Sequence, residues 1–283
     1  MHNKADTSTI LERNYGKATQ LNETLKKGEA YLWYLGGNSP PYFGYAVKTK
    51  RNLLLFNPTE INKSSEAGLA NGYLNPNELS DQNITVLILY KSYQGRFDRP
   101  SVPELAKQLP VTNFVLNFEP TPDTAYGNYI PPYKIASPNE SFSMGDIQIH
   151  TIPAAAKAWF GGEGLGYLVE VDGLKIFHAG LHTTGNNAPD VEKYRKEIDF
   201  LKPFGPVDIV ILPVNSNHVW WIDYKSYLYL IDQLSPKAIY LIGDKSVKNE
   251  HKKCMEVLKA RDVPVFYPEG GIAVGQRFHY QRD

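Results

Sequence analysis

The sequence predicts a four-layer αββα sandwich of the α/β (α+β) class, in which helices cover the outer faces of two central sheets. Three observations lead to this prediction. The first half of the chain is a series of short apolar runs, and the second half begins with further runs before alternating between helix and strand patterns. The chain is also long enough, at 283 residues, to bury about 75% of the surface that its unfolded form exposes.

The N-terminal segment has the periodicity of an amphipathic helix. Between residues 8 and 27 the apolar residues near one helical face are Ile10, Leu11, Tyr15, Ala18, Leu21 and Leu25. Gly28 offers a C-terminal stop. We therefore expect residues 1–28 to form a helix that packs on a single domain of residues 29–283.

Apolar runs in the first half indicate successive strands. YLWYL, FGYAV and NLLLF are separated by turn residues, which predicts a mostly antiparallel sheet. ITVLILY at 84–90 is typical of a buried strand, and the polar loop KSYQGRFD and the helix SVPELAKQL follow it. Residues 119–145 contain five prolines and little periodicity, so we expect a long loop or lid.

The second half begins with strands and then alternates helix with strand. Strands are expected at 147–153, 166–171 and 174–180, and Asp172-Gly173 predicts a hairpin turn between the last two. The remaining expected elements are strands at 207–213, 237–243 and 263–268 and helices at 189–201, 222–234 and 247–260. Helices in this arrangement supply an outer layer.

Composition excludes several classes of function. Lys plus Arg and Asp plus Glu number 30 each, so no global field attracts nucleic acid or an anionic membrane. Cys254 is the only cysteine, which excludes an internal disulfide and a multi-cysteine zinc site. No apolar run approaches the roughly 20 residues of a membrane span, and the polar start has no signal-peptide core. We expect a soluble, cytoplasmic protein, unless a leader has been removed from the sequence, and homo-oligomerisation stays open.

Several segments, in collinear order over residues 30–270, resemble the metallo-β-lactamase superfamily. FGYAVKTKRNLLLFNP resembles a first hairpin whose last strand usually ends in aspartate, and ITVLILYKSYQGRFD lines up with the strand and metal loop. GYLVEVDGLKIFHAG, VDIVILPVN and LSPKAIYLIGDKS are similar to the later strands. The resemblance, which is closest to the lactonase-like and phosphodiesterase-like branch, implies the αββα fold and a hydrolase-like ancestry.

The positions that the resemblance assigns to metal ligands carry other residues. Asn57 stands at the aspartate that ends the hairpin, and Lys91, Tyr93, Gly95 and Arg96 occupy the metal loop. The later positions fall at Lys157 or a neighbouring alanine, at Leu181 and at Lys245. Protonated lysine and arginine have no electron pair to give and repel a cation. We therefore predict a degenerate member that holds neither a metal nor another cofactor.

These replacements suggest an anion site in the former metal cleft. An arginine can hold phosphate or carboxylate with two donors, and a lysine acts as a point charge. The expected ligand-binding residues are Lys91, Tyr93, Arg96, Lys157, His182, His218, Trp220, Trp221 and Lys245. The alternative is drift, with internal salt bridges to Asp98, Glu119, Glu163 or Asp244. Tyr126, Tyr129 and Tyr133 are expected either to close over the cavity or simply to pack.

Two other hypotheses remain open. A metal-independent hydrolase, such as a lactonase or phosphodiesterase, would use Lys91, Tyr93, Lys157 or Lys245 as nucleophile, base or electrostatic clamp, with His182 carrying a proton. A scaffold or regulatory subunit would keep the fold while aromatic side chains such as Trp220 and Trp221 plug the cleft. His178, on a predicted strand, is expected to be a core histidine or to lie just behind the ligand.

Overall fold

The computed structural model describes the elements of both halves of the chain. The described residues are 21, 23–36, 44–58, 61–63, 68–89, 102–120, 132–154, 164–180, 182, 188–214, 224–242, 248–267 and 274–282. None of the helices in these ranges is long and apolar enough to cross a membrane.

The first sheet has the strand order β14-β1-β2-β3-β4-β5-β6. Its strands are β1 (Glu29–Leu35), β2 (Gly44–Lys48), β3 (Asn52–Phe56), β4 (Asn83–Leu87), β5 (Val111–Leu116), β6 (Tyr133–Ile135) and β14 (Arg277–Gln281). The strands from β14 to β3 pair antiparallel, whereas those from β3 to β6 pair parallel. The expectation of a mostly antiparallel sheet is thus wrong for the second part. Crossovers that contain α1 (Pro76–Leu79) and α2 (Val102–Gln108) return the chain to the same edge, which parallel pairing requires.

The second sheet has the order β13-β12-β11-β10-β9-β8-β7. Its strands are β7 (Ser141–Met144), β8 (Ile147–Ala154), β9 (Gly164–Val171), β10 (Leu174–His178), β11 (Ile209–Pro213), β12 (Ala238–Ile242) and β13 (Val265–Phe266). The helices of this half, all predicted, are α3 (Ala188–Leu201), α4 (Lys225–Leu234) and α5 (Lys248–Leu258). The predicted hairpin turn is also confirmed, because Asp172 and Gly173 adopt φ values of 48° and 82°.

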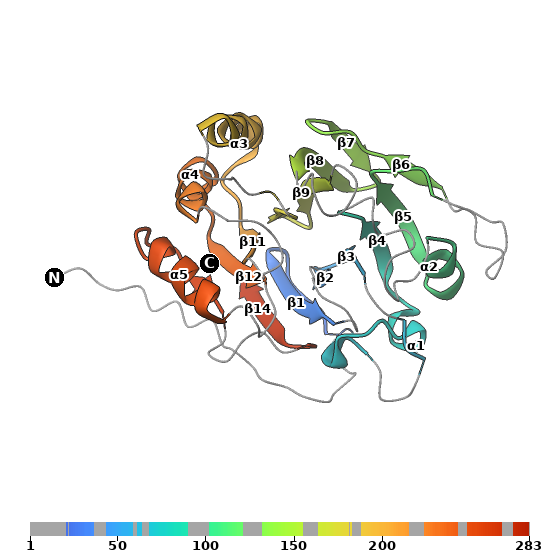
Figure 1. Ribbon diagram of the computed structural model, residues 1–283. Coiled ribbons are helices and arrows are strands. Elements are labelled where there is room, and N and C mark those ends of the chain that lie inside the picture. The colour runs from blue at the N-terminus through green and yellow to red at the C-terminus, as the bar shows by residue number, and fades with distance from the viewer. Residues whose placement is uncertain are drawn as a thin grey trace.

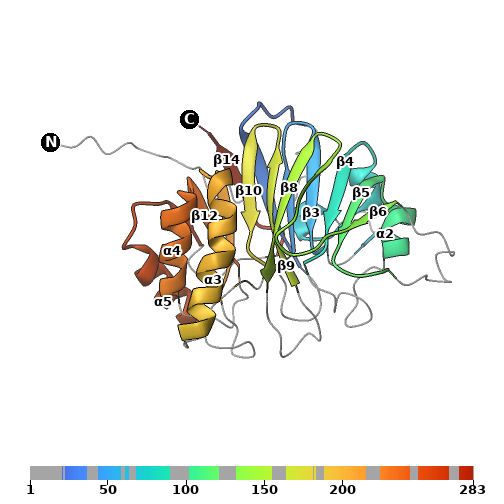
Figure 2. The ribbon, with the colours of Figure 1, turned by 90° about the horizontal axis from the view of Figure 1, so that it is seen from above.

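The layers follow from three apolar clusters. One cluster lies between the sheets and includes Tyr45, Phe56 and Tyr167. A second places α2 against the outer face of the first sheet, and a third places α3, α4 and α5 against the outer face of the second. Figures 1 and 2 show these helices on opposite sides of the two sheets. The predicted four-layer αββα sandwich is therefore confirmed.

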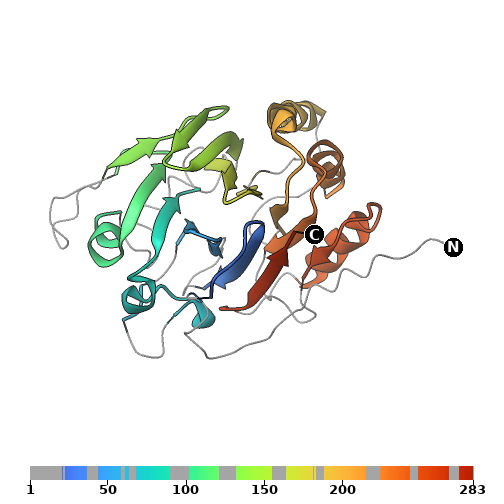
Figure 3. The same ribbon diagram turned by 180° about the vertical axis from the view of Figure 1, so that it is seen from behind.

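The first and last described strands are neighbours in the first sheet. β14 pairs antiparallel with β1, and Figure 3 shows the red strand beside the blue one. Two short 3-10 helices, η2 (Leu69–Asn71) and η4 (Lys202–Phe204), complete the described elements. This pairing joins segments about as far apart in sequence as the chain allows, and nothing local in the sequence predicts it.

Two expectations need correction. Residues 119–145 are not one loop, because β6 and β7 lie within them as edge strands and pair with β5 and β8. The N-terminal helix does not run to residue 27, because residues 24–26 have no regular structure and the chain turns at Lys27 and Gly28 into β1. The N–H of Gly28, at φ 90°, donates to the carbonyl of Asp172. The rest of the expected helix lies outside the described residues, apart from Leu21 and Glu23.

Candidate functional site

The carboxyl ends of strands from both sheets meet at one edge of the sandwich. β8 and β10 are both antiparallel to β9, and β10, β11 and β12 are parallel to one another, so these four strands end at the same edge. The N–H of Leu165, at the start of β9, donates to the carbonyl of Leu89, beyond the end of β4, at 2.8 Å. The hydroxyl of Tyr167 donates to the carbonyl of Ile88 at 2.7 Å. We call this edge, formed by the ends of β3, β4, β8, β10, β11 and β12, the carboxyl-end rim.

The residues expected from the sequence lie in the segments that follow these strand ends. Lys91, Tyr93 and Arg96 follow β4, Lys157 follows β8, and Lys245 follows β12, while His218, Trp220 and Trp221 follow β11. All of them lie outside the described residues, as do Gly95, Asp98, Tyr126, Tyr129, Glu163, Leu181 and Asp244. These segments therefore start from strand ends at one rim, the edge at which open α/β sheets bind ligands, and the structure describes no position for the residues themselves.

Asn57 joins the end of β3 to the end of β4. Its backbone N–H donates to the carbonyl of Leu87 at 2.9 Å, and its side-chain Oδ1 accepts from the N–H of Leu89 at 3.0 Å. Asn57 is 1% exposed and has a φ of 48°, a left-handed conformation that asparagine adopts more readily than most residues. Because a backbone N–H can only donate, the atom facing Leu89 must be the oxygen, and the amide nitrogen must point the other way.

The amide nitrogen of Asn57 has no hydrogen-bond partner within the described part of the chain, although it is buried. A buried donor without an acceptor costs about 1–3 kcal/mol. The site thus presents an N–H group at the end of β3, and an amide nitrogen carries no lone pair for a cation.

His178 is a core histidine, one of the two expectations for it. It is fully buried at the end of β10, and its ring centroid lies 5.0 Å from that of Phe56 in the space between the sheets. Its Nδ1 accepts from the N–H of Gly180 at 3.0 Å. The neutral tautomer with its proton on Nε2 is the one that fits this bond.

His182 faces the outer helical layer. Its Nε2 lies 2.7 Å from Oε2 of Glu197 on α3, and its ring stacks on Tyr194 with a centroid separation of 4.4 Å. His182 is 2% exposed, and its Nδ1 has no hydrogen-bond partner in the described ranges. His182, which comes four residues after the end of β10, is thus tied to α3. A role for His182 in proton transfer stays a prediction.

Other residues from the sequence analysis have local partners. The hydroxyl of Tyr133 donates to Oε2 of Glu119 at 2.7 Å, and Tyr133 is 37% exposed. Cys254 is a free, buried thiol on α5, and burial raises its pKa. Within the described ranges no group of three or more His, Cys, Asp and Glu side chains is arranged to hold a metal ion.

A comparison with family models gives one match, to the beta-lactamase superfamily domain, over residues 78–242. That span is more than half of the 283-residue chain. The chain belongs to this superfamily. The predicted metallo-β-lactamase fold is therefore confirmed, and the match begins in α1 and ends with β12, so it contains most of the strands that form the carboxyl-end rim.

Solved structures share this superfamily's fold at low sequence identity. CmlA, a diiron β-hydroxylase from Streptomyces venezuelae, is 10% identical with a TM-score of 0.61 over 92% of this chain, which spans only 55% of the length of CmlA. Igni18, a metallo hydrolase from the archaeon Ignicoccus hospitalis, is 16% identical with a TM-score of 0.57, covering 90% of this chain and 100% of its own. Unliganded yeast PDE1 is 8% identical with a TM-score of 0.54, covering 89% and 99%. A comparison with curated proteins gave no match.

CmlA is a diiron enzyme and Igni18 is a metallo hydrolase, so the residues of this chain can be compared with what a metal pair requires. The described group at the end of β3 is the buried amide donor of Asn57, not a carboxylate. Both described histidines near the rim have other partners, since His178 accepts from Gly180 and His182 pairs with Glu197. Of the described residues at the rim, Asn57 therefore offers a donor, and His178 and His182 each use one ring nitrogen within the protein. Glu197 was missed from the sequence because it lies on an amphipathic helix, where a charged residue usually faces solvent.

Proposed function

We propose that this protein is a degenerate superfamily member that binds an anionic small molecule, bearing phosphate or carboxylate, at the carboxyl-end rim without a metal pair. The observation that carries this proposal is the orientation of the Asn57 amide. Its oxygen is committed to the N–H of Leu89, so its buried nitrogen offers a hydrogen to an acceptor. An anion supplies such an acceptor, whereas a metal ion does not.

The cationic residues in the segments that leave this rim support the same proposal. Lys91 and Arg96 follow β4, Lys157 follows β8, and Lys245 follows β12. An anion that draws on several of these groups neutralises their mutual repulsion, and arginine adds a geometrically specific pair of donors. Trp220 and Trp221, which follow β11, supply aromatic faces for a ring on the ligand.

A metal-independent hydrolase is a second candidate, favoured by the pairing of His182 with Glu197. The carboxylate of Glu197 orients the imidazole of His182, and Nδ1 of His182 has no partner in the described ranges. A histidine base oriented in this way activates the nucleophile in many enzymes. Lys91 or Tyr93 would then be the nucleophile or electrostatic clamp. Release of product from phenyl phosphate and from simple lactones by the wild type, abolished by Lys91→Ala and His182→Gln, separates this candidate from binding alone.

Titration calorimetry with phenyl phosphate tests the proposal, because this probe combines a dianion with an aromatic ring. We expect saturable binding that weakens roughly tenfold or more in Lys91→Ala and in Arg96→Ala, since each removes one charge-assisted contact. Lys252→Ala, an exposed charge change on α5, is the matched control and should bind as the wild type does. Failure to bind, or equal weakening in all three variants, contradicts the proposal.

A further inference from the structure

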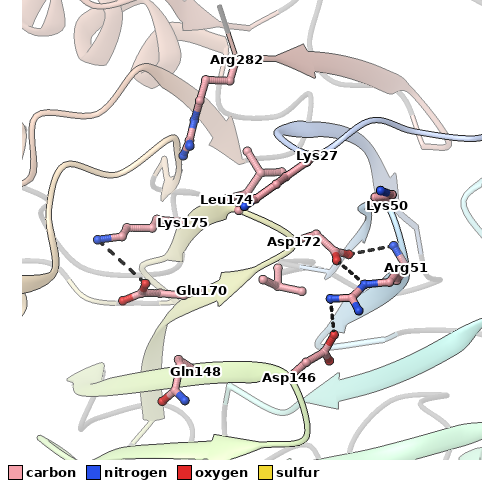
Figure 4. A pocket seen from close by; sticks show the side chains of 12 residues that line it. Lys27, Lys50, Arg51, Asp146, Gln148, Glu170, Asp172, Leu174, Lys175 and Arg282 are labelled. Carbon is pink, nitrogen blue, oxygen red and sulfur yellow. Dashed lines mark hydrogen bonds and ion pairs between the residues drawn. The ribbon is translucent and has the colours of Figure 1, made fainter.

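A hollow of about 590 Å³ opens at the edge of the sandwich opposite the carboxyl-end rim. It lies where the β2–β3, β7–β8 and β9–β10 turns meet, at Lys50-Arg51, Asp146 and Asp172-Gly173. Five cationic and three acidic side chains line it, so its formal charge is +2. Its volume falls in the range typical of small-molecule sites. We call it the hairpin hollow, and Figure 4 shows its lining.

The aspartates of the hairpin hollow already have partners within the protein. Asp172, whose side chain is 2% exposed, accepts hydrogen bonds from the hydroxyl of Thr49 at 2.7 Å and from Nδ2 of Asn52 at 3.2 Å. It also accepts from the backbone N–H and Nε of Arg51 at 2.7 and 2.9 Å. The same guanidinium reaches Asp146 at 2.7 Å. Burial alone would raise the pKa of Asp172, but these hydrogen bonds outweigh burial and lower its pKa.

Glu170, the third acid, is also engaged. Its Oε1 lies 3.3 Å from Nε2 of His150, and its Oε2 lies 3.9 Å from Nζ of Lys175. Each carboxylate of the hollow therefore has a basic or donor partner within the protein.

Three cationic side chains of the hairpin hollow contact the protein and still have N–H groups that form no hydrogen bond in the described ranges. Arg282 donates through Nε, at 2.8 Å, and Nη2 to Asp208, whose side chain is 4% exposed, and no bond from its Nη1 occurs within the described ranges. Nζ of Lys175 donates one hydrogen to the carbonyl of Phe204 at 2.6 Å, and an ammonium has three. The stem of Lys27 lies across Gly173, where a Cβ would come within 2.6 Å of its Cε. Figure 4 shows all three side chains on one side of the hollow, across from Arg51 and Asp146.

We propose that the hairpin hollow is a second anion site, which takes a small phosphate-bearing molecule. Groups that are held by contacts with the protein lose little freedom when a ligand binds, so their unused donors are preorganised. Lys27 and Lys50 form no ion pair in the described part of the chain, and they add two positive charges to the lining of the hollow. A phosphate group accepts hydrogen bonds from several directions, which suits donors from three separate segments.

This site differs from the one at the carboxyl-end rim. β3 begins at Asn52, beside the hollow, and ends just before Asn57, at the rim. Binding at the hairpin hollow and binding at the rim therefore test two separate proposals, and the measurement must show at which of the two sites the ligand binds.

Backbone-amide NMR shifts during titration with inorganic pyrophosphate locate the ligand. We expect saturable shifts at Gly173 and Lys175, with an affinity that falls roughly tenfold in Lys27→Met, which removes one charge and keeps an unbranched stem. Lys175→Gln should weaken binding similarly. Lys252→Met, on α5, makes the same charge change away from the hollow and should leave affinity unchanged.

Three outcomes overturn this proposal. One is the absence of saturable shifts at Gly173 and Lys175 in the wild type. Another is equal weakening by Lys27→Met and Lys252→Met, which would mean that net charge alone governs binding. The third is shifts confined to Asn57 and Leu89, which would support the rim site and leave the hollow without a ligand.

Discussion

The side-chain oxygen of Asn57 accepts a hydrogen bond from the backbone N–H of Leu89 at 3.0 Å, just beyond the ends of β3 and β4. A carboxylate could accept the same bond. What asparagine adds is the buried amide nitrogen on the other side, a donor where a cation would need an electron pair.

Replacing Asn57 should destabilise the fold. Asn57→Ala leaves the N–H of Leu89 without an acceptor and forces alanine to a φ of 48°, so we expect a loss of about 1–3 kcal/mol in the free energy of unfolding. Urea denaturation measures it. Asn57→Asp, which keeps the acceptor, should lose less stability but bind phenyl phosphate more weakly, because it sets a negative charge beside the ligand. Tighter binding by Asn57→Asp would contradict the proposed site.

The contact between His182 and Glu197 should contribute to stability as a unit. His182→Phe keeps an aromatic ring for stacking on Tyr194 but removes the short contact to buried Glu197, which keeps only Lys193 at 3.7 Å, and we expect a loss of about 1.5–3 kcal/mol. Glu197→Gln tests the other partner. In a double-mutant cycle the two changes should be strongly non-additive, and simple additivity would show that the 2.7 Å contact contributes nothing.

Asp172 should link the two sheets in a pH-dependent way. Its hydrogen bonds to Thr49, Arg51 and Asn52 join the β2–β3 turn of the first sheet to the β9–β10 turn of the second. Because its folded pKa is lowered, its contribution is present above the unfolded pKa of about 3.9 and is lost as pH falls through the folded value. Asp172→Asn should cost about 1.5–3 kcal/mol at neutral pH and flatten the acid limb of the stability curve. An unchanged acid limb would count against this role.

His150 should destabilise the protein as the pH falls. It is stacked on Phe204 at 3.6 Å between ring centroids and hydrogen-bonded to Ser141 and Glu170. Burial lowers its pKa, and Glu170 only partly opposes this. The unfolded chain therefore takes up a proton first, and stability present above about pH 6.5 declines below it. Between pH 7.5 and about 5, the melting temperature of His150→Gln should fall less steeply than that of the wild type. Equally steep falls would contradict a destabilising role for protonation of His150.

The sequence predicts the fold better than the site. Apolar runs such as 84–90 and 207–213 identify buried strands because burial on both faces demands continuous apolar residues. β14 was missed because its partner β1 lies at the other end of the chain, and β6 and β7 were missed because edge strands tolerate exposed polar residues.

Contacts between distant segments account for the missed parts of the site. The contact of His182 with Glu197 depends on how α3 packs, and the hairpin hollow depends on three turns that meet only after folding. Neither leaves a local pattern. Asn57, in contrast, was recognisable from its place at the end of a predicted strand, although only the fold reveals which way its amide points.

The most direct test of the central claim is elemental analysis of protein purified without chelators and in the presence of zinc, manganese and iron. We predict metal content well below one ion per chain, with phenyl phosphate binding unchanged by EDTA. One or two equivalents of a transition metal per chain, retained through gel filtration and needed for ligand binding, would contradict the claim that donors have replaced metal ligands at the carboxyl-end rim.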